Sequence, residues 1–360
     1  MTEVDIVLPR KNFDLVVREV FSAGITGIFG PSGSGKTSLL HAISGLAKPV
    51  GGSIIINERI LFSAEKRINI PVEKRNIGYV FQEGRLFPHL NIEKNLRYGL
   101  KKGIMPKIGF NEVVDLLELK DILNSKPARV SGGERQRTAL GRSLLSSPDI
   151  LLLDEPFSAV DTNLRKQILP FIIRIQQRYN IPILVVSHDL PDLLRLTSTL
   201  CVLKEGKSIG HDEYYELLKI QEIASLFGSG ALVNSIEMKM KEPEPDTSLT
   251  YLSWKEKDRE VLIKCDRSAV VYSEGQSLRV FIHADDIALS TEKVANVSIQ
   301  NQLEGVVEEI IQRDSSLLCI VDAGIKLVVE ITEASRQRLH IEPGKKVWCL
   351  IKSVAIDTLI

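Results

Sequence analysis

The chain has 360 residues, 44% of them hydrophobic, which is enough to bury the cores of two domains. Its 46 basic and 46 acidic residues give a formal net charge of zero, which argues against a basic protein that binds nucleic acid. The four cysteines are scattered without the C-x-x-C spacing of a zinc or redox site, so we expect small buried thiols in a reducing cytosol.

The amino terminus and the apolar runs bear on a membrane role. Residues 1–5 carry acidic groups where an export signal would carry positive charge, so we expect no such signal. The longest apolar runs, 150–153 and 181–186, are far shorter than the ~20 residues that span a bilayer. Any association with a membrane is therefore expected to be peripheral.

Short apolar runs alternate with helical patterns over the first 210 residues or so, which predicts a largely parallel sheet with crossover helices. The predicted strands are 25–29, 77–81, 150–153 and 183–186, with 52–57 as an added antiparallel strand. The predicted helices are 36–46, 111–119, 132–145, 164–179 and 213–227. Pro170 is expected to bend or interrupt the fourth helix.

The pattern changes near residue 230, and residues 239–246 are polar and interrupted by prolines. Beyond them, short strands predict a small OB-like β-barrel. These strands are 278–282, 317–321, 325–331 and 347–354. We detect no heptad repeat and no tandem duplication, and we predict two domains, 1–230 and 231–360.

A glycine-rich motif of the form G-x-x-x-x-G-K-T lies between a predicted strand and a predicted helix, the order that a P-loop requires. Glycines let successive N–H groups point at one anion, and the helix that begins near Lys36 adds its positive end. Lys36 is expected to reach the outer phosphates, and the Thr37 hydroxyl suits Mg²⁺. The predicted nucleotide site comprises Gly30, Pro31, Ser32, Gly33, Ser34, Gly35, Lys36 and Thr37.

An acidic pair, Asp154-Glu155, follows four apolar residues and is expected at the carboxyl end of a buried strand beside the P-loop. Asp154 suits Mg²⁺ coordination, directly or through water. Glu155 suits the positioning and polarisation of an attacking water. The alternative is an acidic pair that only caps the end of a core strand.

Residues 130–134, Val-Ser-Gly-Gly-Glu, resemble the LSGGQ signature of the ABC family, with valine and glutamate in place of leucine and glutamine. Ser131 is expected to cap a helix whose free N–H groups can meet a γ-phosphate. Gln82 resembles the Q-loop glutamine, Asp161 lies in a segment similar to the D-loop, and His188 resembles the switch histidine. The resemblance covers about residues 1–230.

This resemblance implies an α/β P-loop ABC ATPase cassette, with an antiparallel β subdomain and a helical subdomain, followed by the all-β barrel. It implies ATP and Mg²⁺ as cofactors, with Glu155, His188 and Gln82 as catalytic residues and Thr37, Gln82 and Asp154 at the metal. It also implies a head-to-tail homodimer, in which Ser131, Gly132 and Gly133 of the second copy complete each ATP site, and two transmembrane permease subunits.

Residues 71–82, 84–89 and 95–99 resemble the molybdate importer ATPases within the ABC family. Residues 297–305 and 351–354 are similar to the molybdate-binding Mop domain, which would span about 291–357. The resemblance implies an importer ATPase for molybdate, or for molybdate and tungstate, at the cytoplasmic face of a prokaryotic inner membrane. A periplasmic or extracellular oxyanion-binding protein would belong to the same system.

A tetrahedral dianion needs converging hydroxyl, amide and ammonium donors. Ser298, Asn301, Lys352 and Ser353 offer that set, but Gln300 stands where some oxyanion-binding relatives carry arginine. Two interpretations remain open: an oxyanion sensor, or a barrel that only dimerises or stabilises the cassette.

Other functions also remain open. The chain could serve a sulfate, ferric iron or other small-solute importer, or it could be a soluble molybdate-sensing regulator that uses ATP as a structural ligand. Phe13 could stack on the adenine or belong to the core.

Overall fold

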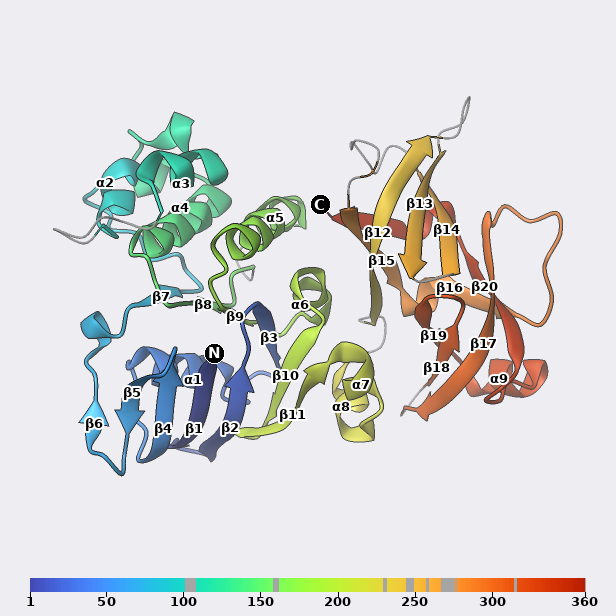
Figure 1. The fold of residues 1–360 in the computed structure, drawn as a ribbon, viewed down its shortest axis with the longest axis horizontal. Helices are drawn as coiled ribbons and strands as arrows, with labels where there is room; N and C mark the ends of the chain where they lie inside the picture. Colours follow the sequence, from blue (N-terminus) through green and yellow to red (C-terminus); the bar gives the residue numbers. More distant parts are fainter. Residues whose placement is uncertain are drawn as a thin grey trace. The chain divides into compact units, whose positions relative to one another are not determined.

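The computed structural model describes residues 1–100, 108–157, 162–228, 232–243, 249–256, 259–266, 275, 277–313 and 316–359. The chain divides into two compact units, Met1–Tyr214 and Tyr215–Ile360 (Figure 1). This division falls before the boundary at residue 230 that the composition suggested. The short helices α7 (Tyr214–Leu218) and α8 (Gln221–Leu226) replace the single helix expected over 213–227.

The first unit is built on one mixed sheet, with strand order β6-β5-β4-β1-β2-β11-β10-β3-β9-β8-β7. Its parallel part contains β10 (Thr199–Lys204), β3 (Ile25–Phe29), β9 (Ile183–Val186), β8 (Ile150–Asp154) and β7 (Ile77–Val80). Every residue of β8 and β9 is buried, as expected for strands covered on both faces. The segments that follow these parallel strands therefore meet at one edge of the sheet.

The other part of this sheet is mainly antiparallel. It contains β1 (Thr2–Pro9), β2 (Asp14–Phe21), β4 (Gly51–Ile56), β5 (Arg59–Ser63), β6 (Ile68–Asn69) and β11 (Lys207–Glu213). Strand β4 pairs antiparallel with both β1 and β5, which confirms the antiparallel strand predicted over 52–57. A buried apolar cluster joins β1, β2, β4 and β5 to β3, β8 and β9.

Helices α1 (Lys36–Ser44), α5 (Thr162–Tyr179) and α6 (Leu190–Leu196) follow strands of the parallel part. A separate group contains α2 (Ile92–Arg97), α3 (Phe110–Leu116) and α4 (Gly132–Leu145), in which α2 and α3 both pack on α4 (Figure 1). The expected interruption at Pro170 was wrong, because α5 runs continuously through it. Its buried residues Leu169, Phe171 and Ile172 hold the helix in place by tertiary packing. Among the described residues, no helix has the length and apolar character of a membrane span.

The second unit is a duplicated β fold, contrary to the expectation of no tandem duplication. One sheet has the order β14-β13-β12-β15-β21 and the other has the order β19-β18-β17-β20-β16. The first repeat ends with β16, which lies in the second sheet, and the second repeat ends with β21, which lies in the first sheet. Each of these strands follows a 3₁₀ turn, and the two repeats thus exchange their last strands.

The first repeat comprises β12 (Val233–Pro243), β13 (Leu249–Glu256), β14 (Arg259–Asp266), β15 (Ser277–His283) and β16 (Ile287–Ser290). The second comprises β17 (Asn301–Gln312), β18 (Leu317–Asp322), β19 (Lys326–Ile331), α9 (Glu333–Leu339), β20 (Lys346–Ile351) and β21 (Ile356–Leu359). One apolar core is shared by both sheets.

Two buried asparagines join the repeats in equivalent ways. Asn234 accepts a hydrogen bond from the Val328 amide and donates to the carbonyl oxygens of Val328 and Ile282. Asn301 accepts from the Lys264 amide and donates to the carbonyl oxygens of Lys264 and Ile351. Each side chain therefore ties its own repeat to the third strand of the other.

The remaining polar contacts explain why α8 belongs to the second unit. The Arg313 guanidinium donates to the carbonyl oxygen of Phe227, the residue after α8, and forms an ion pair with Glu330 at 3.3 Å. Arg313 and Glu330 are both largely buried, so this network holds α8 against the barrel.

All four cysteines are buried free thiols, as expected. Burial raises the pKa of Cys265 to about 11 and the pKa values of Cys201, Cys319 and Cys349 to about 12.

Arg75 is 1% exposed and holds the C-terminal end of α1. Its guanidinium donates to the carbonyl oxygens of Ala42 and Ile43, in the last turn of the helix, at 3.0 and 2.8 Å. It also donates to the Ile70 carbonyl and to the Asn69 side chain. A cation at this end of a helix is favoured by the helix dipole, so Arg75 fixes α1 against the segment that leads into β7.

Replacing Arg75 with methionine should lower the free energy of unfolding of the first unit by about 3 kcal/mol or more, because buried carbonyl groups lose their donors. The control is Arg59→Met, since Arg59 is exposed and donates only to the Lys74 carbonyl among the described contacts; its expected cost is within about 1 kcal/mol. Urea unfolding followed by far-UV circular dichroism measures both. Equal costs for the two variants would contradict the anchoring role.

Candidate nucleotide site

A cavity of about 390 Å³ opens at the edge of the sheet where the parallel strands end. Segments far apart in the chain contribute to it: the P-loop, Gln82 after β7, Glu155 after β8 and His188 after β9. The lining residues are Phe13, Ser32, Gly33, Gly35, Lys36, Thr37, Ser38, Gln82, Glu155 and His188. The structure thus brings together the predicted residues from four separate motifs.

The P-loop is shaped to receive an anion. A Cβ atom on Gly30 would lie 2.1 Å from the Leu203 carbonyl oxygen, so no larger residue fits there without a backbone shift. The Lys36 ammonium donates to the carbonyl oxygens of Gly30 and Pro31 at 2.7 and 3.0 Å. Ser34 Oγ is buried and has no hydrogen-bond partner among the described residues.

Burial lowers the pKa of Lys36, while the nearby carboxylates of Glu155 and Asp154 oppose that effect. Lys36 therefore stands as a largely desolvated cation beside two acidic groups. Such a cation gains more from an incoming phosphate than an exposed lysine would.

Asp154 ends β8 and is only 6% exposed. Its Oδ1 accepts a hydrogen bond from the Thr37 hydroxyl at 2.9 Å, and its Oδ2 accepts one from the Tyr79 hydroxyl at 2.8 Å. Thr37 and Asp154 therefore form a compact pair of hard oxygen groups, the donor chemistry that Mg²⁺ prefers.

Glu155 follows directly and adopts a left-handed backbone conformation, with φ of 47°. Its amide donates to the Val186 carbonyl at 3.0 Å, which fixes the turn at the end of β8. The His188 Nδ1 atom lies 2.9 and 3.0 Å from the two Glu155 carboxylate oxygens. The strained turn therefore holds the carboxylate against the histidine at the mouth of the cavity.

The signature segment forms the start of α4 and does not line this cavity. Ser131 and Glu134 make a capping box: the Glu134 amide donates to Ser131 Oγ at 3.2 Å, and the Ser131 amide donates to Glu134 Oε2 at 2.7 Å. Glutamate in place of glutamine thus serves the helix cap.

Comparison with known proteins relates this geometry to a family. The family described as "ABC transporter" matches residues 16–158, and the family described as "TOBE domain" matches residues 297–357. The molybdenum import ATP-binding protein ModC of Rhodospirillum rubrum is 36% identical over 368 residues, covering 99% of this chain and 97% of the relative. The chain belongs to the ABC transporter ATP-binding proteins.

Further relatives agree with this assignment. ModC of Haemophilus influenzae is 35% identical over 94% of each chain. A dimeric ATP-binding cassette bound to ADP and Pi, in a post-hydrolysis state, has a TM-score of 0.50 and 25% identity over 59% of this chain and 98% of its own. CbiO1 of Clostridium perfringens has the same cassette fold, with a TM-score of 0.51 and 20% identity over 62% of this chain and 92% of its own.

Phe13 of this ABC protein both packs on the core and lines the cavity. Its ring lies over two glycines: a Cβ on Gly206 would be 2.3 Å from Phe13 Cδ2, and a Cβ on Gly35 would be 3.4 Å from Phe13 Cε2. The two interpretations of Phe13 are therefore compatible. Asp161, the predicted D-loop residue, lies outside the described residues.

The four residues predicted for an oxyanion site differ in their exposure and in whether their polar atoms already have hydrogen-bond partners. Ser298 and Lys352 are exposed, and Ser353 Oγ is buried without a partner among the described residues. Asn301 is 3% exposed, and its amide is fully used by the backbone bonds that join the repeats. An oxyanion could bind Asn301 only in exchange for those bonds.

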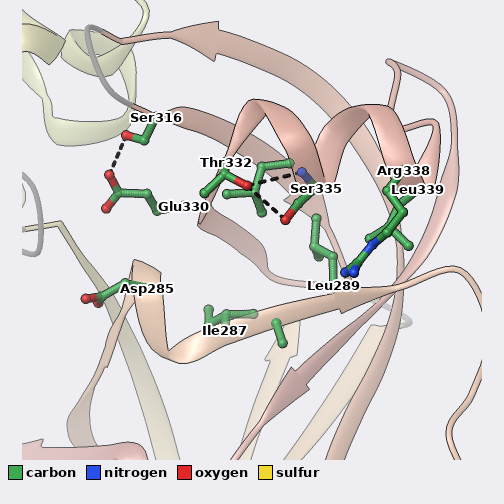
Figure 2. Close-up of a pocket in the computed structure, with 11 residues that line it drawn as sticks. Asp285, Ile287, Leu289, Ser316, Glu330, Thr332, Ser335, Arg338 and Leu339 are labelled. Carbon is green, nitrogen blue, oxygen red and sulfur yellow. Dashed lines mark hydrogen bonds between the residues drawn. The ribbon is translucent and has the colours of Figure 1, made fainter.

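A second cavity, of about 580 Å³, lies in the barrel unit and contains none of these four residues. In Figure 2, Thr332, Ser335 and Arg338 stand on one side, with Ile287 and Leu289 of β16 opposite. Ser316 donates to Glu330, and the Thr332 hydroxyl donates to Ser335, so several of its polar groups are already paired.

Sequence reasoning did not identify Tyr79 as part of the site. Its hydroxyl contact with Asp154 depends on the pairing of β7 with β8, which joins residues 75 positions apart. The available signal was a tyrosine three residues before Gln82, on a strand expected beside Asp154.

Gly30→Ala should abolish ATP binding and lower the thermal midpoint, because the added methyl group meets the Leu203 carbonyl. Gly33→Ala is the control for the cost to stability alone, since Gly33 itself lines the cavity: no protein atom lies within 4 Å of its Cβ position, and its φ of +82° opposes the change. Its expected cost is about 1–2 kcal/mol. Thermal unfolding with and without ATP measures both effects, and a Gly30→Ala protein that is stabilised by ATP like the parent would refute this account.

Proposed function

We propose that this chain is the ATP-hydrolysing subunit of a molybdate ABC importer. The observation that carries the enzymatic part is the cavity in which Lys36, Gln82, Glu155 and His188 converge beside the Thr37–Asp154 pair. The relatives named as molybdenum import proteins, matched over nearly their full length, support the choice of solute.

ATP fits the donor set of the P-loop. The desolvated Lys36 would bind its phosphates, and Phe13, which lines the same cavity, would contact the base. Thr37, Asp154 and Gln82 would hold Mg²⁺, which neutralises phosphate charge when it is bound.

Hydrolysis requires a water oriented toward the γ-phosphate. The Glu155 carboxylate is the group suited to orient that water and to accept its proton. In the structure, His188 holds this carboxylate with Nδ1. We infer that His188 then contacts the γ-phosphate, so that it links the water-orienting group to the nucleotide.

The proposed working unit is a homodimer. Ser131, Gly132 and Gly133 lie outside the cavity of their own chain, so donors from this segment would reach ATP from a second copy. Loss of the γ-phosphate would remove the bridge between the copies and let the dimer open.

The opening and closing would drive two transmembrane permease subunits, which receive molybdate from a periplasmic or extracellular oxyanion-binding protein. The chain would then lie peripherally at the cytoplasmic face of the inner membrane. Its barrel unit would sense molybdate or tungstate through Ser298, Lys352 and Ser353, while Asn301 keeps its bonds to the backbone.

Glu155→Gln should reduce steady-state ATP hydrolysis at least about a hundredfold while ATP binding remains, because the amide cannot accept the proton from water. Phosphate release and nucleotide binding are measured on the same purified full-length protein. In size-exclusion chromatography, the variant should form an ATP-dependent dimer. Hydrolysis at the parent rate would refute the role of Glu155, and a monomer that hydrolyses ATP at full rate without a permease would refute the composite site.

Calorimetric titration of the full-length protein tests the solute. Molybdate and tungstate should bind and sulfate should not, and Ser353→Ala should weaken binding of the first two because it removes the one buried, unpartnered hydroxyl of the set. Thr358→Ser, a conservative change on β21 outside that set, is the control. Strong sulfate binding would favour a sulfate importer, and no binding of any anion would favour a purely structural barrel.

A further inference from the structure

Asp154 receives one donor on each carboxylate oxygen, and the two donors come from different elements. Thr37, at the start of α1, binds Oδ1, and Tyr79, on β7, binds Oδ2. The carboxylate is therefore held from both sides by side chains of this chain. Only one of the two donors, Thr37, lines the nucleotide cavity.

Tyr79 is itself held in place. Its ring packs against Phe81, with ring centroids 4.3 Å apart, and against His41 at 5.9 Å. Strand β7 pairs with β8 in parallel, with Tyr79 opposite Leu152, which sets the reach of the hydroxyl toward Asp154.

We propose that Tyr79 is a positioning residue for the metal half of the nucleotide site, acting through Asp154. Its hydrogen bond occupies Oδ2 and leaves Oδ1 directed at Thr37, the hydroxyl that lines the cavity. A carboxylate without this bond would turn more freely about its Cβ–Cγ bond. Tyr79 thereby reduces the orientational freedom that Mg²⁺ would otherwise have to remove on binding.

This inference rests on the proposed binding of magnesium and ATP at the P-loop. It distinguishes the binding of the metal from the binding of the ATP phosphates, because Tyr79 contacts Asp154 but, among the contacts described, no residue of the P-loop (residues 30–37). Loss of its hydroxyl should therefore weaken the contribution of the metal and leave metal-free ATP binding intact.

The test uses the full-length protein carrying Glu155→Gln, so that ATP is not consumed. ATP affinity is measured by calorimetry in EDTA and again in excess Mg²⁺, for the parent and for Tyr79→Phe. Metal-free affinity should agree within about twofold, while the gain in affinity caused by Mg²⁺ should fall about tenfold in Tyr79→Phe, a typical cost of losing an outer partner of a metal ligand. Phenylalanine keeps the ring contacts, and thermal unfolding verifies that the variant is folded.

Tyr98→Phe is the matched control, since Tyr98 is 66% exposed and lies away from the cavity; its magnesium gain should equal that of the parent. In an Asp154→Asn background, Tyr79→Phe should have no further effect on the gain. An unchanged gain in Tyr79→Phe, or an equal loss with and without Mg²⁺, would overturn the inference while the proposed function stands. A parent protein without any magnesium gain would instead overturn the proposed metal site itself.

Discussion

The structure depends on one short helix, α1, being held at both ends. Its N-terminal residues Lys36 and Thr37 enter the nucleotide cavity, where the helix dipole favours an anion. Its C-terminal carbonyl groups are bound by the buried guanidinium of Arg75. The dipole of α1 favours both the positive charge of Arg75 at its C-terminal end and a phosphate at its N-terminal end, so Arg75 and the phosphate site stabilise the same helix. The buried cation needs no carboxylate partner because four oxygen atoms accept its hydrogen bonds.

A second constraint links the strands that follow one another in the sheet. Asp154 on β8 is bound by Thr37 from α1 and by Tyr79 from β7, while Glu155 is fixed to Val186 at the end of β9. The acidic pair therefore fixes the positions of α1, β7 and β9 relative to one another. Any change in the spacing of these elements must alter the orientation of at least one carboxylate, which explains why chemistry is concentrated at this edge of the sheet.

The sequence was informative where a function resides in contiguous residues. The P-loop, the acidic pair and the capped helix at Ser131 each have local causes, namely glycine conformations, an apolar strand and an N-cap. The contacts of Tyr79 and Arg75 could not be predicted in the same way, because their partners lie 75 and about 32 positions away. The first contact depends on the pairing of β7 with β8, and the second on the packing of α1. The predicted interruption at Pro170 was wrong because the packing of the buried face of α5 outweighs the low helix propensity of proline. The duplication in the second unit is visible in the order and pairing of its strands, which the sequence does not display.

That duplication also changes how Asn301 should be understood. Asn234 stands at the equivalent position of the first repeat and makes the equivalent three hydrogen bonds, to Val328 and Ile282 instead of Lys264 and Ile351. The two asparagines occupy equivalent positions and bind equivalent backbone groups, so both are explained by their role in joining the exchanged repeats. Neither needs a ligand to explain its presence. A resemblance in sequence around residue 301 is therefore not independent evidence for an anion. The chemical argument for an oxyanion rests on the exposed Ser298 and Lys352 and, above all, on the buried Ser353 hydroxyl, which has no partner among the described residues.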